Sequence, residues 1–263
     1  MTQTAAELAS AAWVDPAVLT AHPGYTAVVV SASGLRPGAS TDHSEQLLAD
    51  AERQAQELLA GRTPADLPEI AAWRDAFAAF GVKQRVARSS AEALLRRVEA
   101  GLPRIDRLTD VYNAVSVRNL TPLGGEDATG YVGAPRLVIA TGDEDFETVA
   151  GGEPVVESAA PGEVIWRDDA GVTCRRWNWR QCTRTRLGEG TTEAFFIIDA
   201  LGPDAAGRAL TAASELTANL AVDSPDATFT TRVLAGDVAG GSPAASGSEA
   251  DQTDDVGPGR KVD

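Results

Sequence analysis

The chain has 263 residues, enough for one large domain or two small ones, and 43% of them are apolar, so it can bury a core. Its 38 acidic and 23 basic residues give a formal charge of −15, which excludes a protein that coats nucleic acid non-specifically but allows one local basic patch. Two cysteines exclude a disulfide framework and a four-ligand zinc site made of thiolates, and two histidines argue against a His-dependent hydrolase or a His-rich metal site. No long apolar run or signal-peptide pattern is present. We therefore expect a cytoplasmic protein with no membrane contact, metal or cofactor.

The first half of the chain predicts a buried strand followed by helices. The β-branched run at 26–31 is typical of a buried strand. Asp42 with Glu45 and Ser89 with Glu92 have the spacing of capping boxes, and Asp106 is placed to cap a further helix. The helices are expected at 42–60, 66–81, 89–101 and 106–119.

The second half is richer in glycine and in short apolar runs. Residues 122–133 are predicted as loop, and strands are expected at 136–141, 163–166, 172–177, 193–199 and 227–233, with a helix at 203–220. Asp168–Gly171 is a hairpin signal between two of these strands. The order predicts an α+β fold, with helices early and mainly antiparallel strands late. We expect one domain over 1–234 and a disordered acidic tail at 235–263, which has almost no large apolar residues.

A series of motifs between residues 90 and 127 resembles the B3/B4 domain of the bacterial phenylalanyl-tRNA synthetase beta subunit. The series is Ser90, Leu94 and Arg97, then Gly101–Asp106, then Asp110 and Asn113, and nine residues later Pro122–Asp127. The intervals match those of the family, and the likeness extends more loosely over 76–200. The chain resembles the free-standing B3/B4 proteins and carries no aminoacylation motif.

The resemblance implies a pocket for an aminoacyl group and a role similar to a second sieve, which hydrolyses wrongly charged tRNA. Two positions depart from the family. The family's pocket histidine corresponds to Gly124, and its Met-Gly-Gly pocket segment falls on Trp179–Gln181. Glycines leave space and expose backbone N–H groups, whereas Trp, Arg and Gln fill space and supply side-chain donors.

An arginine-rich segment, Cys174–Arg186, contains five arginines, two tryptophans and no acid. Guanidinium groups bind phosphates and carboxylates in a bidentate manner, and tryptophan stacks on rings and cations. Strand alternation would place Cys174, Arg176, Asn178 and Arg180 on one face. In the alternative interpretation the arginines point outward and pair with surface acids. The predicted ligand contacts are Trp177, Asn178, Arg180 and Thr183, and the predicted anion or RNA contacts are Arg97, Arg175, Arg176, Arg184 and Arg186.

The second candidate is Leu123–Asp127, where two glycines precede two carboxylates. Gly124 and Gly125 would let the backbone approach a ligand closely. Glu126 and Asp127 could orient a water molecule or bind an α-ammonium group, and we name them as the catalytic candidates. A tight loop with solvated acids is the competing interpretation. Asn113 could face the pocket, or it could hold neighbouring loops by hydrogen bonds.

Two functions remain open from the sequence. In the first, the protein recognises RNA or aminoacyl-tRNA and, if it is an enzyme, hydrolyses the ester of a mischarged tRNA; it is not a tRNA ligase on its own. In the second, it is a non-catalytic module that binds an amino-acid-like small molecule. A third and weaker interpretation is an accessory protein that uses the scaffold to contact a partner. The two cysteines, Cys174 and Cys182, are expected to be buried thiols, and the oligomeric state stays open.

Overall fold

The computed structural model describes residues 3–83 and 85–235 of the chain. The helices are α1 Ala5–Ala11, α2 Pro16–Ala21, α3 Asp42–Leu59, α4 Pro68–Ala79, α5 Ser90–Leu95, α6 Arg107–Asn119 and α7 Ala205–Asp223. The strands are β1 Trp13–Val14, β2 Thr26–Ser33, β3 Leu123–Asp127, β4 Arg136–Ile139, β5 Asp145–Ala150, β6 Glu153–Ser158, β7 Val164–Arg167, β8 Val172–Arg175, β9 Arg180–Gln181, β10 Glu193–Ala200 and β11 Thr228–Ala235.

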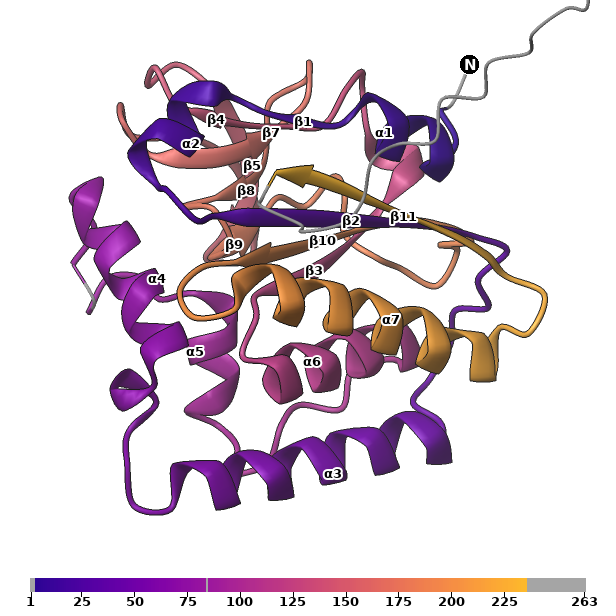
Figure 1. The fold of residues 1–263 in the computed structure, drawn as a ribbon. Helices are drawn as coiled ribbons and strands as arrows, with labels where there is room; N and C mark the ends of the chain where they lie inside the picture. The colour runs from indigo at the N-terminus through magenta and orange to yellow at the C-terminus, as the bar shows by residue number, and fades with distance from the viewer. Residues whose placement is uncertain (1–2, 84, 236–263) are drawn as a thin grey trace, which may run out of the picture.

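Two sheets and a group of helices form the layers of the molecule. One sheet has four antiparallel strands in the order β11-β2-β10-β3, and the other has five in the order β1-β4-β7-β8-β9. In the second sheet only the β1–β4 pair is parallel. Helices α6 and α7 lie along one side of the four-stranded sheet, and α3 packs on α6 (Figure 1). This arrangement confirms the predicted α+β class with mainly antiparallel strands.

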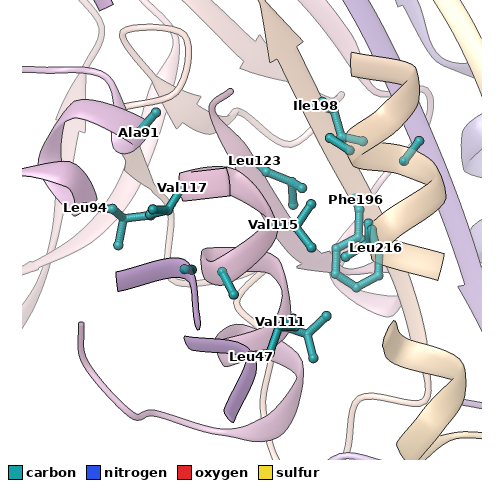
Figure 2. Close-up of a cluster of buried hydrophobic side chains, with 14 of the residues drawn as sticks. Leu47, Ala91, Leu94, Val111, Val115, Val117, Leu123, Phe196, Ile198 and Leu216 are labelled. Carbon is teal, nitrogen blue, oxygen red and sulfur yellow. The ribbon is translucent and has the colours of Figure 1, made fainter. Parts of the chain in front are cut away.

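The side chains of β10 alternate between two hydrophobic cores. Phe196 and Ile198 pack among the helices (Figure 2), whereas Phe195 and Ile197 join the cluster that includes Trp166 of the five-stranded sheet. Because side chains alternate along a strand, Asp199 points to the same side as Phe195 and Ile197. The central strand thus places one carboxylate between the two sheets.

The helix boundaries follow local capping chemistry. Asp106 caps α6 and Ser89 caps α5, as predicted. The capping box expected from Asp42 is wrong: the cap of α3 is Thr41, which exchanges hydrogen bonds with Ser44. Helix α5 is also shorter than predicted and ends at Leu95 rather than near residue 101.

Three stretches differ from the sequence-based expectation. Leu123–Asp127, predicted as loop, is strand β3. Its two glycines disfavour a strand locally, but pairing with β10 supplies the backbone hydrogen bonds that stabilise one. The elements between residues 5 and 21 and the β5–β6 hairpin were not predicted. Of the tail predicted at 235–263, Ala235 ends strand β11, and 236–263 lie outside the described residues. No helix in the described ranges is long and apolar enough to cross a membrane.

Candidate functional site

A pocket of about 250 Å³ opens between the helices and the two sheets. Helices α5 and α6 form one wall, β3 and β10 contribute a second, and β7, β8, β9 and the turn before β9 contribute the third. The volume is just below the roughly 300–1,000 Å³ of typical ligand sites, so it suits a small molecule. Six of the sequence-predicted residues line it, namely Asn113, Gly124, Glu126, Trp177, Asn178 and Arg180.

Glu126 is a buried carboxylate at the end of β3, with 3% of its surface exposed. The hydroxyl of Tyr131 donates a hydrogen bond of 2.6 Å to its Oε2. Burial raises the pKa of Glu126 to about 7, although the hydroxyls of Tyr131 and Thr185 stabilise the charged form and act in the opposite direction. This side chain therefore exchanges a proton near neutral pH.

Asp199 is a second buried carboxylate in the pocket, and we did not predict it from the sequence. Burial raises its pKa to about 7, against the hydrogen bond that the Tyr25 hydroxyl donates to Oδ1. Trp166 Nε1 donates to the same oxygen at 3.4 Å. The sequence did contain an indication of this buried acid, because Asp199 directly follows the apolar run 194–198. Strand alternation places it on the same side as Phe195 and Ile197, in the protein interior.

The turn between β8 and β9 places two polar groups at the pocket. Arg176 and Trp177 have φ values of 47° and 65°, so the chain turns sharply here and the prediction of one continuous strand is wrong. The amide atoms of Asn178 and Nε1 of Trp177 are buried without a hydrogen-bond partner among the described residues. Both groups lie close enough to Asp199 to lower its pKa. Their donors therefore face the Asp199 carboxylate, and the amide oxygen of Asn178 stays available to accept a hydrogen bond from a bound molecule.

Aromatic side chains hold this turn in place. The Trp177 ring is fully buried and meets Tyr25 and His22 edge to face, with centroids 4.8 Å away in each case. Trp73 of α4 approaches it in the same way at 5.1 Å. This packing connects α4 to the pocket wall. It also stabilises the turn against the strain of the positive φ values at Arg176 and Trp177.

Arg180 lies at the pocket margin, where the β5–β6 hairpin contacts it. Its Nη2 donates to Val149 O at 3.2 Å, and its Nη1 is 3.6 Å from Glu157 Oε1. The neighbouring Gln181 donates to Gly125 O at 3.1 Å, which ties β9 to β3. Trp179 also lines the pocket, and the guanidinium of Arg176 stacks 4.2 Å from its ring centroid.

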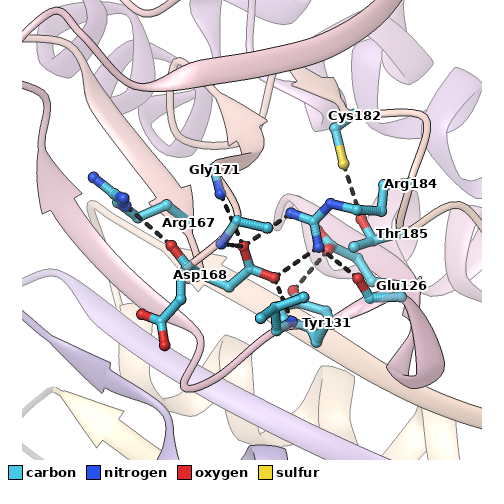
Figure 3. A network of polar contacts seen from close by, with 12 residues as sticks. Glu126, Tyr131, Arg167, Asp168, Gly171, Cys182, Arg184 and Thr185 are labelled. Atoms are coloured by element: carbon cyan, nitrogen blue, oxygen red, sulfur yellow. Dashed lines mark hydrogen bonds and ion pairs between the residues drawn. The ribbon is translucent and has the colours of Figure 1, made fainter. Parts of the chain in front are cut away.

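Arg184, predicted as an anion contact, instead pairs with Asp168 in a network behind the pocket (Figure 3). Its two terminal nitrogens lie 2.7 and 2.9 Å from the carboxylate of Asp168. That carboxylate is fully buried and also accepts backbone hydrogen bonds from the turn before β8 and from Val132. The guanidinium therefore stabilises the fold rather than an external anion.

Arg175 is likewise paired inside the protein. Its guanidinium makes a bidentate contact with Glu163, at 3.0 and 2.9 Å, and a further one with Glu157 at 2.9 Å. Arg175 and Arg184 therefore pair with acids, as the alternative interpretation expected. These pairs are partly or wholly buried, however, and do not lie on the outer surface.

The remaining predicted residues do not line the pocket: they are Gly125, Asp127, Thr183, Arg97, Arg176 and Arg186. Asp127 accepts from Thr129 N at 2.8 Å and from Thr191 Oγ1 at 2.6 Å, so it caps the short helix Ala128–Gly130 instead of orienting a pocket water. Within the described residues, no group of three or more His, Cys, Asp or Glu side chains could hold a metal ion.

A family model described as the B3/4 domain matches residues 72–220, which is more than half of the chain. The chain belongs to the B3/4 domain family. The matched region includes every element that lines the pocket, from α5 to β10. The resemblance noted in the motifs between residues 90 and 127 is thus confirmed.

One solved structure similar to this B3/4 protein is an N-terminal fragment of the phenylalanyl-tRNA synthetase beta subunit from Pyrococcus horikoshii. The two chains are 13% identical with a TM-score of 0.42, and the match covers 83% of this chain. It covers 49% of the synthetase fragment, so this chain corresponds to about half of that fragment's length. No curated protein matches the chain.

Proposed function

We propose that this B3/4 protein recognises an amino-acid-like group in the pocket, and that a tRNA presents this group at its end. The pocket chemistry supports the first part, because two buried carboxylates, Glu126 and Asp199, share one small cavity with aromatic and aliphatic side chains. Membership of the B3/4 family, together with the resemblance of residues 90–127 to the synthetase domain, supports the second. A protein that meets tRNA in this way would work in the cytoplasm.

The cavity offers complementary groups to each part of an aminoacyl moiety. An ionised Glu126 or Asp199 would pair with the α-ammonium group. The amide oxygen of Asn178, which has no hydrogen-bond partner among the described residues, would accept from the amine of the ligand. Leu94, Tyr112 and the other apolar lining residues would contact its side chain.

Ester hydrolysis is the reaction that this arrangement supports best, and Glu126 is the proposed base. A carboxylate with a pKa of about 7 is ionised in half of the molecules at neutral pH and can accept a proton from water. The water oxygen would form a bond to the ester carbonyl carbon, and the bond from that carbon to the ribose oxygen would break. The proton held by Glu126 would then pass to the leaving ribose oxygen.

A binding module without catalysis is the second candidate. It is favoured by the hydrogen bond that already engages Glu126 with Tyr131 and by the bulky Trp179–Gln181 segment that stands where the family has a glycine pair. Such a protein would retain the aminoacyl group without attacking its ester.

A deacylation assay with a panel of labelled aminoacyl-tRNAs tests the proposal. We expect release of one amino acid by the wild-type protein, and a loss of about 10²–10⁴-fold in the Glu126→Gln variant because the base is removed. Glu57→Gln, an exposed change on α3, is the matched control and should hydrolyse normally. Binding of an aminoacyl-tRNA without release would favour the binding module, and neither binding nor release across the panel would overturn the tRNA proposal.

A further inference from the structure

Three arginines converge on one buried carboxylate beside the pocket. Glu92 of α5 has 1% of its side chain exposed, and its Oε1 lies 2.5 Å from Arg74 Nη2, 2.9 Å from Arg96 Nε and 3.4 Å from Arg88 Nε. One carboxylate neutralises one of the three positive charges. Arg74 also interacts with Asp66, so the excess positive charge of the cluster lies with Arg88 and Arg96, whose side chains are 37% and 42% exposed.

Further positive charges surround this cluster. Between residues 83 and 97 the sequence has five basic side chains and one acidic one, Glu92, in a chain with a net charge of −15. Lys83, Arg85 and Arg97 are exposed, and none of their side chains makes a hydrogen bond or ion pair with another residue in the described ranges. A surface of this sign on so acidic a protein is a local electrostatic feature that attracts anions.

The basic surface continues directly from the mouth of the pocket. Ala93 lines the pocket and is exposed, so it lies at the opening. Arg96 is the C-cap of α5 and follows Ala93 by three residues, and Arg97 is the next residue along the chain. The backbone N–H of Arg97 bonds to Leu94 O, so a tight turn follows the end of α5 and keeps this residue beside the helix. The positive charges at the C-terminal end of α5 thus adjoin the pocket that Ser90, Ala93 and Leu94 of this helix line.

We infer that this basic surface, made of Lys83, Arg85, Arg88, Arg96 and Arg97, binds the phosphate backbone of a single-stranded RNA segment whose end enters the pocket. The inference rests on the proposed function, for which it supplies the RNA contact. Repeated phosphodiesters match a group of basic side chains that flank one short helix, with Lys83, Arg85 and Arg88 before α5 and Arg96 and Arg97 at its C-terminal end. The arginines of Cys174–Arg186 suit this role less well, because Arg175 and Arg184 are paired with buried acids.

The test measures how the binding of a short fluorescein-labelled single-stranded RNA depends on salt, by fluorescence anisotropy between about 50 and 200 mM KCl. The variant is Arg85→Gln with Arg97→Gln, which removes two positive charges whose side chains have no partner in the described residues. The matched control is Arg36→Gln with Arg53→Gln, which removes the same charge from exposed sites elsewhere. Circular dichroism checks that both variants are folded.

We expect the plot of log affinity against log salt to become shallower by about 1.4 in the Arg85/Arg97 variant, because each phosphate contact with a single strand contributes about 0.7. The control should keep the wild-type slope. Equal slopes in both double variants would overturn the docking surface and leave the pocket proposal intact. An absence of RNA binding to the wild type would overturn both the docking surface and the tRNA part of the proposed function. Calorimetry with phenylalaninamide then reports separately on the pocket, and the Arg85/Arg97 variant should bind it as the wild type does.

Discussion

Replacing Glu126 by glutamine should change how the stability of the protein depends on pH. The pKa of this carboxyl rises from its ordinary value of 4.5 to about 7 in the folded protein. The folded state therefore holds a proton more tightly than the unfolded state. Glutamine keeps the shape and an oxygen that can accept from Tyr131, but it does not titrate.

The sign and size follow from proton linkage. Between pH 4.5 and about 7 the folded protein binds more protons at Glu126 than the unfolded chain does, so its free energy of unfolding falls as pH rises. The stabilising contribution is complete below pH 4.5 and lost above pH 7. At about 1.36 kcal/mol per pKa unit, the change amounts to about 3 kcal/mol. Any fixed cost of burying the amide is the same at each pH and cancels.

Urea unfolding of the wild type and of Glu126→Gln at intervals from pH 4.5 to pH 8 measures this difference. We expect the wild type to lose about 3 kcal/mol relative to the variant over that range. The surface change Glu57→Gln serves as control, and it should follow the wild type throughout. A constant difference between wild type and Glu126→Gln at all pH values would refute the reasoning, because it would mean that the carboxyl has the same pKa in the folded and unfolded states.

Three further changes test the site and its support. Tyr25→Phe removes a hydroxyl that lowers the pKa of Asp199, so carboxyl NMR should find that pKa above 7; an unchanged or lower value would contradict this. Gly125→Ala should lower the free energy of unfolding in urea by about 1–3 kcal/mol, because the added Cβ would lie 2.8 Å from an aromatic carbon of β10. Gly124→Ala, whose Cβ would have nothing within 4 Å, should stay near wild type, and equal effects of the two changes would refute the packing. Trp73→Ala should lower the free energy of unfolding by about 3–5 kcal/mol, because the buried ring packs against the turn that lines the pocket. A loss below about 1 kcal/mol in urea unfolding would show that this contact is not formed.

The sequence by itself determined the class of fold and the position of many elements. Apolar runs and capping residues have local causes, so the strand at 26–31, the hairpin around Asp168–Gly171 and the caps Ser89 and Asp106 were predicted from a few neighbouring residues. The spaced motifs from Ser90 to Asp127 likewise indicated the B3/4 family, which the family model confirms over 72–220.

Only the tertiary structure decided which side chains share the pocket. Asp199 and Glu126 are far apart in the sequence, and their raised pKa values arise from burial between packed layers, which no local pattern specifies. The partners of Arg175 and Arg184 are acids 12 and 16 residues away, so their charges are used inside the fold and not at its surface. Long-range pairing also made a strand of Leu123–Asp127 despite its glycines, because β10 supplied the hydrogen bonds and the apolar neighbours.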